Sequence, residues 1–362
     1  MMDHSSPHRN IRAWSWLCAC LLLCLMLPGC SNSSAITISN PSSATPAPSA
    51  ATDMSMSSSG SAGLKLYIEP DAGEKVITNA ISGAKKSVWL EIYLLTDKKV
   101  INALEDAAHR HVDVRVMLEV HPYGNGSVSP QQTLEKLRAA GIKTQATSPD
   151  FALTHEKGMV IDGQTAYIMT SNFTNAALGN SKYTLNREYG IIDSNAQDVK
   201  SVQNIFTADW NRQPFKLNNS RLVVSPLNSH STFLSLIGSA QKSISIEAEE
   251  MQDSKVEQAL TTAARRGVKI QVVLPDSSSN DSNQEGITTI KKGGAQVKQD
   301  KRLYMHAKII IVDQHKAFVG SENISTASLD KNRELGIVVS DASVINALSQ
   351  TFQSDWQASQ TA

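Results

Sequence analysis

The chain has 362 residues, and its 34 basic residues balance its 34 acidic residues. Because no net charge attracts a polyanion, the composition argues against a protein that binds nucleic acid or anionic lipid through bulk charge. The four cysteines all lie within residues 18–30, which excludes disulfides and thiolate chemistry from the rest of the chain.

Residues 1–30 are typical of an export signal. A basic start is followed by an apolar run over Ala13–Leu27 and then by small residues. The run is shorter than the roughly 20 apolar residues that a membrane-spanning helix needs. Leu27–Cys30 resembles the lipobox of bacterial lipoproteins, which implies cleavage before Cys30 and acylation of its thiol. We therefore expect an exported protein anchored by lipid on the periplasmic face of the outer membrane, with a soluble periplasmic or secreted protein as the alternative.

Residues 31–63 predict a disordered linker. They are mostly Ser, Ala, Thr and Pro, with almost no charged or large apolar side chains. Such a segment cannot bury enough surface to offset the entropy that it would lose on ordering. The folded part of the chain is therefore expected to begin at Leu64.

An internal repeat divides the folded part into two halves, residues 64–215 and 216–358. The segment that starts at Ser82 matches the segment that starts at Gly238, and shorter loops in the second copy reduce the offset further along the chain. Because one unusual motif occurs once in each copy, we expect the halves to pack face to face as an intramolecular pseudo-dimer within a monomer.

Hydrophobic periodicity predicts the same order of elements in both copies: helix, strand, helix, strand, loop, helix and a further pair of strands. The predicted segments of the first copy are Val76–Ala84, Ser87–Leu95, Val100–Ala107 and Val112–Glu119, and those of the second copy are Thr232–Ala240, Ser243–Ala248, Val256–Ala263 and Val268–Pro275. This order predicts an α/β sandwich with mixed β-sheets flanked by helices. The loops 121–130 and 276–283 are candidates for substrate selection.

The motif His-x-Lys-x-x-x-x-Asp occurs twice, over His155–Asp162 and His306–Asp313. Further along, both copies carry a hydroxyl residue two positions before an Asn, and then the string Asn-Arg-Glu. One such motif could arise by chance, whereas two at matched positions of a repeat indicate one shared site. The recurring residues are His155, Lys157, Thr170, Asn172 and Glu188 in the first copy, and His306, Lys308, Ser321, Asn323 and Glu334 in the second.

These residue types suit a phosphoryl group. His and Lys at positions i and i+2 of a strand point to the same face, so two imidazoles and two ammonium groups are expected to converge where the halves meet. One imidazole would attack phosphorus while the other protonates the leaving oxygen, and Glu188 and Glu334 would hold the second ring nitrogens. The predicted substrate-binding groups, which offset charge or donate hydrogen bonds, are Lys157, Lys308, Thr170, Ser321, Asn172 and Asn323.

By these residues the chain resembles the phospholipase D superfamily, whose signature is HxKxxxxD followed by a GSxN-type segment. The resemblance covers the whole folded part. It implies a metal-independent phosphodiesterase that needs no cofactor and forms a covalent phosphohistidine, with His155 as the nucleophile and His306 as the general acid. The residues themselves leave that assignment open. The resemblance also implies that Asp162 and Asp313 are structural. The first copy departs from the family at Met169, where Gly is frequent.

A metal site at His155-Glu156 is not expected, because a zincin would need a second His at the position of Met159. The main hypothesis for function is phospholipase D-like hydrolysis, or transphosphatidylation, of phospholipid headgroups, favoured by the export signal and the expected anchor at Cys30. An exported endonuclease would need a basic track with interleaved aromatic residues, which the balanced charge and 5% aromatic content disfavour. Two further candidates are a cardiolipin synthase-like transferase and a non-catalytic envelope protein, and the two intact motifs count against an envelope protein without activity.

Overall fold

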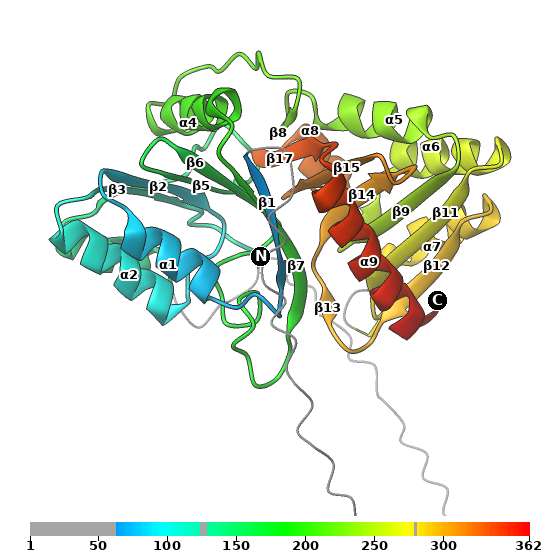
Figure 1. Cartoon of the computed structure of the whole chain (residues 1–362), viewed down its shortest axis with the longest axis horizontal. Helices are drawn as coiled ribbons and strands as arrows, with labels where there is room; N and C mark the ends of the chain where they lie inside the picture. Colours follow the sequence, from blue (N-terminus) through cyan, green and yellow to red (C-terminus); the bar gives the residue numbers. More distant parts are fainter. Residues whose placement is uncertain (1–62, 124–128, 279–280) are drawn as a thin grey trace, which may run out of the picture. The chain divides into compact units, whose positions relative to one another are not determined.

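The computed structural model describes residues 63–123, 129–278 and 281–362, which belong to one unit of the chain. The predicted leader with Cys30 and the linker up to residue 62 lie outside the described residues. Within the described part, two similar eight-stranded sheets, each flanked by helices, confirm the predicted α/β architecture (Figure 1).

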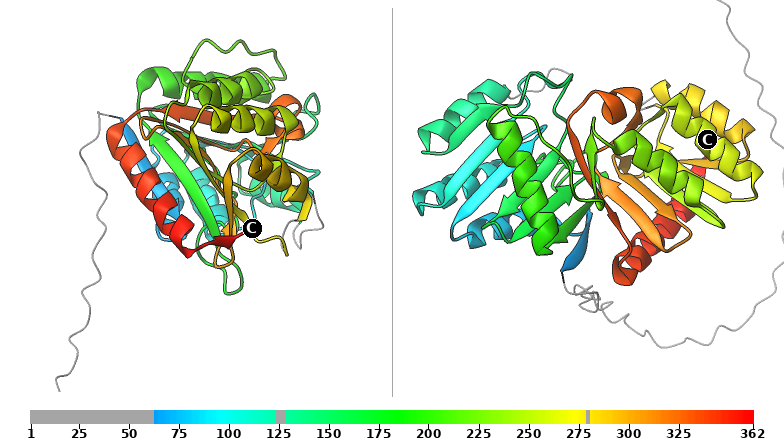
Figure 2. Two further views of the ribbon diagram at one scale, coloured as in Figure 1. Left: turned by 90° about the vertical axis from the view of Figure 1, so that its right-hand side faces the viewer. Right: turned by 90° about the horizontal axis from the view of Figure 1, so that it is seen from above.

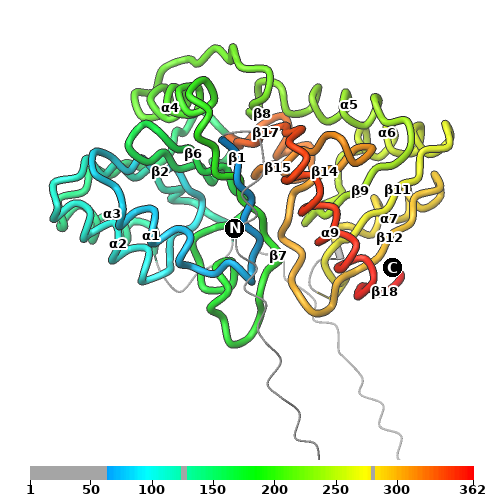
Figure 3. The backbone as a smooth tube through the Cα atoms, in the orientation of Figure 1, coloured from blue at the N-terminus to red at the C-terminus, as the bar shows by residue number. Residues whose placement is uncertain are grey.

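The elements of the first half follow one another without interruption. They are β1 (Leu64–Glu69), α1 (Lys75–Gly83), β2 (Ser87–Ile92), α2 (Lys98–His109), β3 (Asp113–Leu118), α3 (Pro130–Ala139), β4 (Lys143–Ala146), β5 (Lys157–Ile161), β6 (Thr165–Met169), β7 (Asn186–Asp193) and α4 (Ala196–Trp210). Figure 3 follows the chain from α4 across residues 211–221 into the second half.

The second half repeats this order with six short additions, β10, η1, β13, β16, α8 and β18. Its elements are β8 (Leu222–Ser225), α5 (Ser229–Ser239), β9 (Ser243–Ala248), β10 (Met251–Gln252), α6 (Ser254–Arg265), β11 (Lys269–Pro275), η1 (Asp281–Asn283), α7 (Gln284–Lys292), β12 (Gln296–Asp300), β13 (Tyr304–Met305), β14 (Lys308–Val312), β15 (Lys316–Gly320), β16 (Ile324–Ser325), α8 (Thr326–Asp330), β17 (Glu334–Val339), α9 (Ala342–Ala358) and β18 (Gln360–Thr361).

The strand order of the two sheets is equivalent. The first sheet runs β1-β7-β6-β5-β2-β3-β4, and the second runs β8-β17-β15-β14-β9-β11-β12 with β18 added at its edge. The motif strands β5 and β14 therefore occupy the same central place. Each is antiparallel to the strand that follows the first predicted helix, with Ile92 opposite Lys157 and Ala248 opposite Lys308. The residue after Ile92 and the residue after Ala248 thus lie at equivalent positions beside the two motifs.

Local sequence explains why the elements begin where they do. Asp97 and Asp253, which are equivalent in the repeat, cap α2 and α6 by accepting hydrogen bonds from backbone N–H groups of the first turn. The apolar stripe predicted for the first helix of each half is buried, with Ile77 and Phe233 both 0% exposed. Each stripe packs on the outer face of its own sheet.

A third apolar core joins the two halves. It combines residues of β5, β6 and β7 with residues of β14, β15 and β17, and it includes the buried faces of α4 and α9. Figure 2 shows the two sheets side by side, with the helices α1 to α3 and α5 to α7 on their outer faces. The halves therefore share one interior and form the expected intramolecular pair.

Two buried ion pairs cross between the halves. Arg187 of β7 binds Asp355 of α9 through two hydrogen bonds of 2.6 and 3.0 Å. Its counterpart Arg333 binds Asp209 of α4 at 2.9 Å. Removing one partner of such a pair leaves a buried charge uncompensated, which typically costs about 3–5 kcal/mol. Each half therefore depends on the last helix of the other.

The aspartates that end the two motifs hold the sheet together. Asp162 has φ 55°, and its carboxylate accepts hydrogen bonds from the backbone N–H groups of residues 85–87. Asp313 has φ 53° and accepts from the N–H groups of residues 241–243. Both carboxylates therefore fix the start of the neighbouring strand, which agrees with the structural role that the resemblance implies.

No helix among the described residues combines the length and the apolar character that crossing a membrane requires.

Candidate active site

Each half reaches across to the other immediately before its motif. β13 pairs with β7, with Met305 opposite Arg187, and in the first half Thr154 forms a bridge to Arg333. The next residue is a histidine on one side and a glutamate on the other. This reciprocal pairing therefore places each histidine beside the glutamate of the opposite half.

The histidine–glutamate contacts accordingly cross the pseudo-twofold axis. His155 Nδ1 lies 3.1 Å from Glu334 Oε2, and His306 Nδ1 lies 2.9 Å from Glu188 Oε2. A carboxylate only accepts hydrogen bonds, so Nδ1 of each ring carries the proton and Nε2 is the reactive nitrogen. Burial lowers the pKa of His155, although the charge of Glu334 opposes this effect. His155 is thereby kept neutral, with a free lone pair on Nε2.

Both glutamates are fully buried and are held by neighbouring side chains. Glu188 accepts hydrogen bonds from Thr170 at 2.6 Å and from Asn186 at 3.0 Å. Glu334 accepts from Ser328 at 2.7 Å and from Asn332 at 3.3 Å. These donors fix the carboxylates, and the carboxylates in turn orient the rings.

The two motif lysines are buried at the starts of β5 and β14. Lys157 Nζ donates to the carbonyl oxygen of His155 at 2.5 Å, and Lys308 Nζ donates to that of His306 at 2.6 Å. Burial lowers the pKa of Lys157 to about 7. An anion beside this lysine would favour its charged form, although neither lysine is among the residues that line the cavity around His155 and His306.

Both histidines and both motif asparagines open into one cavity of about 600 Å³. The side-chain oxygens of Asn172 and Asn323 are buried without a hydrogen-bond partner among the described residues. Tyr123, from the first of the two loops predicted to select substrate, also lines the cavity. Residues 124–128 and 279–280 of these loops lie outside the described residues. The cavity is large enough for a phosphodiester and part of each group that it joins.

The structure does not bring the hydroxyls of Thr170 and Ser321 to the cavity. Both side chains are 0% exposed, and neither lines it. Thr170 donates to Glu188 and accepts from the N–H of Tyr189, while Ser321 accepts from the N–H of Leu335. Each hydroxyl lies just after the end of its strand and points toward the neighbouring strand of the sheet. The expected contact with substrate is therefore wrong, and the hydroxyls instead hold the neighbouring strands in place, with Thr170 also binding Glu188.

Several site residues were missed from the sequence. Asn186 and Asn332 belong to the recurring Asn-Arg-Glu string, so their recurrence was a usable signal. Ser328 lies in the added helix α8 and has no counterpart to reveal it. Glu249 contacts the second motif directly, but the equivalent residue of the first half is Tyr93, so no repeat could mark it.

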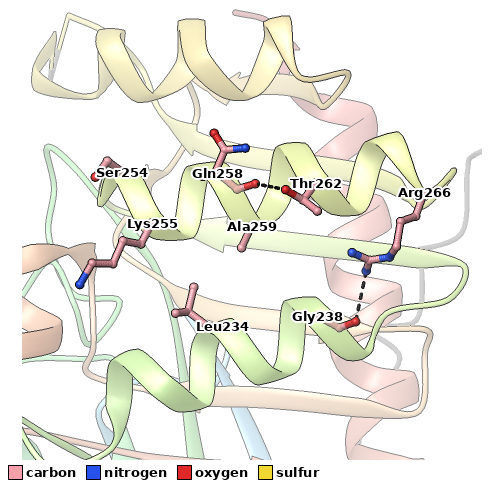
Figure 4. Close-up of a pocket in the computed structure, with 8 residues that line it drawn as sticks. All are labelled: Leu234, Gly238, Ser254, Lys255, Gln258, Ala259, Thr262 and Arg266. Carbon is pink, nitrogen blue, oxygen red and sulfur yellow. Dashed lines mark hydrogen bonds between the residues drawn. The ribbon is translucent and has the colours of Figure 1, made fainter.

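Two other features of the described residues lie apart from this cavity. A surface hollow between α5 and α6 (Figure 4) is lined by Leu234, Lys255, Thr262 and Arg266 among others, but it holds neither motif histidine, and Arg266 there donates to the carbonyl oxygen of Gly238. Three buried carboxylates, of Glu91, Glu156 and Asp209, have oxygens within 4.8 Å of one another.

This carboxylate cluster does not line the cavity. Burial raises the pKa of Glu156 to about 8 and the pKa of Glu91 well above its usual range. Protonated carboxyl groups do not need a cation to lie close together, so we interpret the cluster as part of the packed interior.

Two similar halves that share one dihistidine site define a phospholipase D-like protein. Residues 77–210 and 233–356 each match the family model described as "Cardiolipin synthase, PLD-like domain". The chain belongs to this family and so to the phospholipase D superfamily.

The curated relatives of the chain carry names that match the description of this family. The chain is 24% identical to cardiolipin synthase 1 of Bacillus anthracis over 81% of its own length and 66% of the relative, and 26% identical to the major cardiolipin synthase of Bacillus subtilis over 76% and 65%. It thus spans slightly less than two thirds of these relatives. These names correspond to the cardiolipin synthase-like transferase and not to the hydrolase favoured from the sequence.

Among solved structures, phosphatidylserine synthase of Haemophilus influenzae superposes with a TM-score of 0.64 at 16% identity, covering 83% of this chain and 87% of that one. Polyphosphate kinase of Porphyromonas gingivalis superposes with a TM-score of 0.63 at 17% identity, covering 80% and 46%. At these identities the two likenesses show the fold alone.

Proposed function

We propose that the protein transfers a phosphatidyl group from a phospholipid to an alcohol through a covalent phosphohistidine, as a cardiolipin synthase-type transferase. The observation that carries this proposal is the reciprocal pairing that brings His155 and His306 into one cavity, each held by the glutamate of the other half. The names of the relatives favour transfer to an alcohol over hydrolysis.

In the first step, Nε2 of His155 attacks phosphorus, and the bond between phosphorus and the headgroup oxygen breaks. His306 gives its Nε2 proton to that oxygen, and the headgroup alcohol leaves. Lys157, Lys308 and the two motif asparagines offset or bind the charge on the phosphoryl oxygens. In the second step the acceptor alcohol gives its proton to His306 and attacks phosphorus, which breaks the bond to His155. Water as the acceptor would give hydrolysis by the same route.

The test uses the full chain, purified in detergent and mixed with phosphatidylglycerol vesicles in the presence of EDTA. We expect cardiolipin and free glycerol as products, and we expect His155→Ala and His306→Ala each to abolish both. His315→Ala is the matched control, because this exposed histidine lies in the same half, outside the cavity.

Three results would contradict the proposal. Phosphatidic acid in place of cardiolipin, also when glycerol or another alcohol is supplied, would show a hydrolase. Nicking of plasmid DNA without turnover of lipid would show a nuclease. Activity that survives either histidine substitution would exclude the shared site.

A further inference from the structure

The cavity that holds the two histidines has an apolar wall on its first-half side. The aromatic and aliphatic residues that the first half contributes to its lining are Tyr93, Leu94, Leu153 and Tyr123. Tyr93 and Leu153 are buried and Leu94 is half-buried, whereas Tyr123 is 83% exposed. Because the ring of Tyr93 contacts the ring of His155, this wall begins beside that histidine and reaches the protein surface at Tyr123.

Buried groups hold the backbone on both sides of this exposed ring. The N–H of Tyr123 donates a hydrogen bond of 2.6 Å to the hydroxyl of Tyr93, whose ring meets the ring of His155 edge-on with centroids 4.7 Å apart. Two residues earlier, the N–H of His121 donates to Oε1 of the buried Glu119 at 2.8 Å. These contacts fix the backbone of Tyr123 beside the site and leave its side chain in the solvent at the mouth of the cavity.

Exposed side chains of this size are few. Among the described residues, three large apolar or aromatic side chains are exposed, which are Tyr183 at 99%, Tyr123 at 83% and Leu227 at 49%. Of these three, Tyr123 alone lines the cavity. A single exposed aromatic residue needs no explanation by itself. The position of this one, where the apolar wall of the site meets the solvent, does need one.

The proposed substrate determines what must meet this surface. A phospholipid carries its phosphodiester at the surface of the membrane, and its acyl chains stay in the hydrocarbon core. For such a phosphodiester to reach His155, the mouth of the cavity must come against the bilayer. A tyrosine side chain suits that place, because its apolar ring and polar hydroxyl together favour the level of the lipid headgroups.

We propose that Tyr123 docks the mouth of the cavity on a phospholipid bilayer by placing its ring among the headgroups. This inference rests on the proposed function and adds a membrane-contact surface to the same site. The contact differs from the predicted lipid anchor at Cys30. A flexible linker after that anchor would hold the protein near a membrane without turning the cavity toward it.

The charged residues of the cavity do not offer a different contact with lipid. Its lining within the described part of the chain includes the acidic residues Glu249 and Glu250 but no lysine or arginine. A basic patch would attract anionic lipids, and added salt would weaken that attraction. Docking through Tyr123 depends instead on the removal of an aromatic ring from water, so it should respond little to salt.

The experiment presents one phospholipid headgroup in two physical states. The full chain is diluted until its detergent is below the critical micelle concentration. It is then given either long-chain phosphatidylglycerol in phosphatidylcholine vesicles or dihexanoylphosphatidylglycerol dissolved as monomers, and the release of glycerol is measured. We expect Tyr123→Ser to lower kcat/KM on vesicles roughly three- to tenfold and to keep kcat/KM on monomers within about twofold, because only the vesicle contact loses the ring.

Two further measurements separate an aromatic contact from other effects. Tyr123→Trp should keep the activity on vesicles, since Trp favours the same interface as Tyr. The loss in Tyr123→Ser should be the same at low and at high salt. Tyr183→Ser is the matched control, because it removes an even more exposed tyrosine of the same half outside the cavity, and its ratio of vesicle to monomer activity should stay unchanged. Every variant keeps Cys30, so an anchor there affects all of them equally.

Several results would overturn the inference. They are an unchanged ratio in Tyr123→Ser, an equal loss on vesicles and monomers, a loss in Tyr123→Trp as large as in Tyr123→Ser, an equal fall of the ratio in Tyr183→Ser, and a loss that disappears at high salt. Release of glycerol from neither lipid by the unchanged protein refutes the proposed function instead, so the two failures are distinguishable.

Discussion

The crossed contact between Glu334 and His155 predicts that a substitution in the second half disables the histidine of the first. In Glu334→Gln the amide keeps the size of the side chain and can still accept from Ser328 and Asn332. It loses the charge that holds His155 Nδ1 at 3.1 Å, and both partners are at most 8% exposed. The amide can also turn its NH₂ group toward Nδ1, which would move the ring proton to Nε2 and block the attacking lone pair.

The expected loss follows from these two effects. A hydrogen bond to a charged group contributes about 1.5–3 kcal/mol, and losing that much transition-state stabilisation slows a reaction roughly 10- to 100-fold. Placing the proton on the wrong nitrogen of a catalytic histidine can cost as much as about 10⁴-fold. We therefore expect kcat of Glu334→Gln to fall between about 10- and 10⁴-fold, with little change in melting temperature.

The assay follows transfer from phosphatidylglycerol in the unchanged protein and the variant over a range of pH. Because burial lowers the pKa of His155 and Glu334 opposes this effect, removing Glu334 should move the acidic limb of the kcat/KM profile to lower pH. Glu322→Gln is the matched control, as this buried carboxyl group lies in the same half and binds Ser229 instead of a histidine. A kcat of Glu334→Gln within about threefold of the unchanged protein would refute the reasoning, because losing a hydrogen bond to a charged group is expected to cost at least about tenfold.

Three further predictions concern stability and location. Asp162→Ala should lower the free energy of unfolding by about 1–3 kcal/mol in a denaturant titration, because three backbone N–H groups lose their acceptor, and unchanged stability would contradict this. The pKa of Glu156 in the folded protein, about 8, lies above its ordinary value of 4.5, so the folded state binds the extra proton and stability should fall as pH rises between these values. Glu156→Gln should flatten this fall in a series of melting temperatures, and an equal slope would exclude Glu156 as its cause. Cys30→Ser should release the protein from the membrane fraction if the thiol is acylated, and retention of the variant there would reject the predicted anchor.

The sequence predicted the fold and the two motifs because both are recorded twice. The helix stripes and strands recur in the two copies, so each copy checked the other, and the strand predicted over Ser243–Ala248 matches β9 to the residue. The strands that exceed the predicted pair after the third helix, β4 and β7 with their counterparts β12 and β17, were not predicted, and neither were β1 and β8 at the sheet edge. The strands β1 and β8 are short, and their place beside β7 and β17 depends on pairing with residues far along the chain.

The partner of each histidine was less accessible from the sequence. Glu188 and Glu334 were predicted to hold the rings, but the pattern could not say that Glu334 holds His155, because this exchange depends on the bridge between Thr154 and Arg333. The sequence pattern could not predict the direction of the Thr170 side chain either. The strand β6 ends at Met169, and the alternation of side chains along a strand does not apply after its end. Glu249 was missed because site residues were identified by their recurrence in both copies, and the first copy has Tyr93 at this position.

Where the two copies of the repeat carry different residues, neighbouring positions differ as well. Such paired changes explain how the two sides of one site can differ while the fold is kept. In the second half, Oε2 of Glu247 accepts a hydrogen bond of 2.5 Å from the hydroxyl of Tyr189, which reaches across from the first half. Glu91 is the equivalent of Glu247 in the first half. The counterpart of Tyr189 in the second half is Leu335, which has no hydroxyl, and Glu156 stands where the second half has Ala307. Glu91 therefore has a carboxyl group as its neighbour, whereas Glu247 has a phenol.

The pair of Tyr189 and Ala307 fills about the same volume as the pair of Leu335 and Glu156. Both interiors therefore stay packed, although the polar groups beside Glu247 and Glu91 differ. The exchange of Tyr93 for Glu249 applies the same freedom to the cavity wall. There it places an aromatic ring beside the first motif and a carboxylate beside the second, so the two copies of one motif have different surroundings within one cavity.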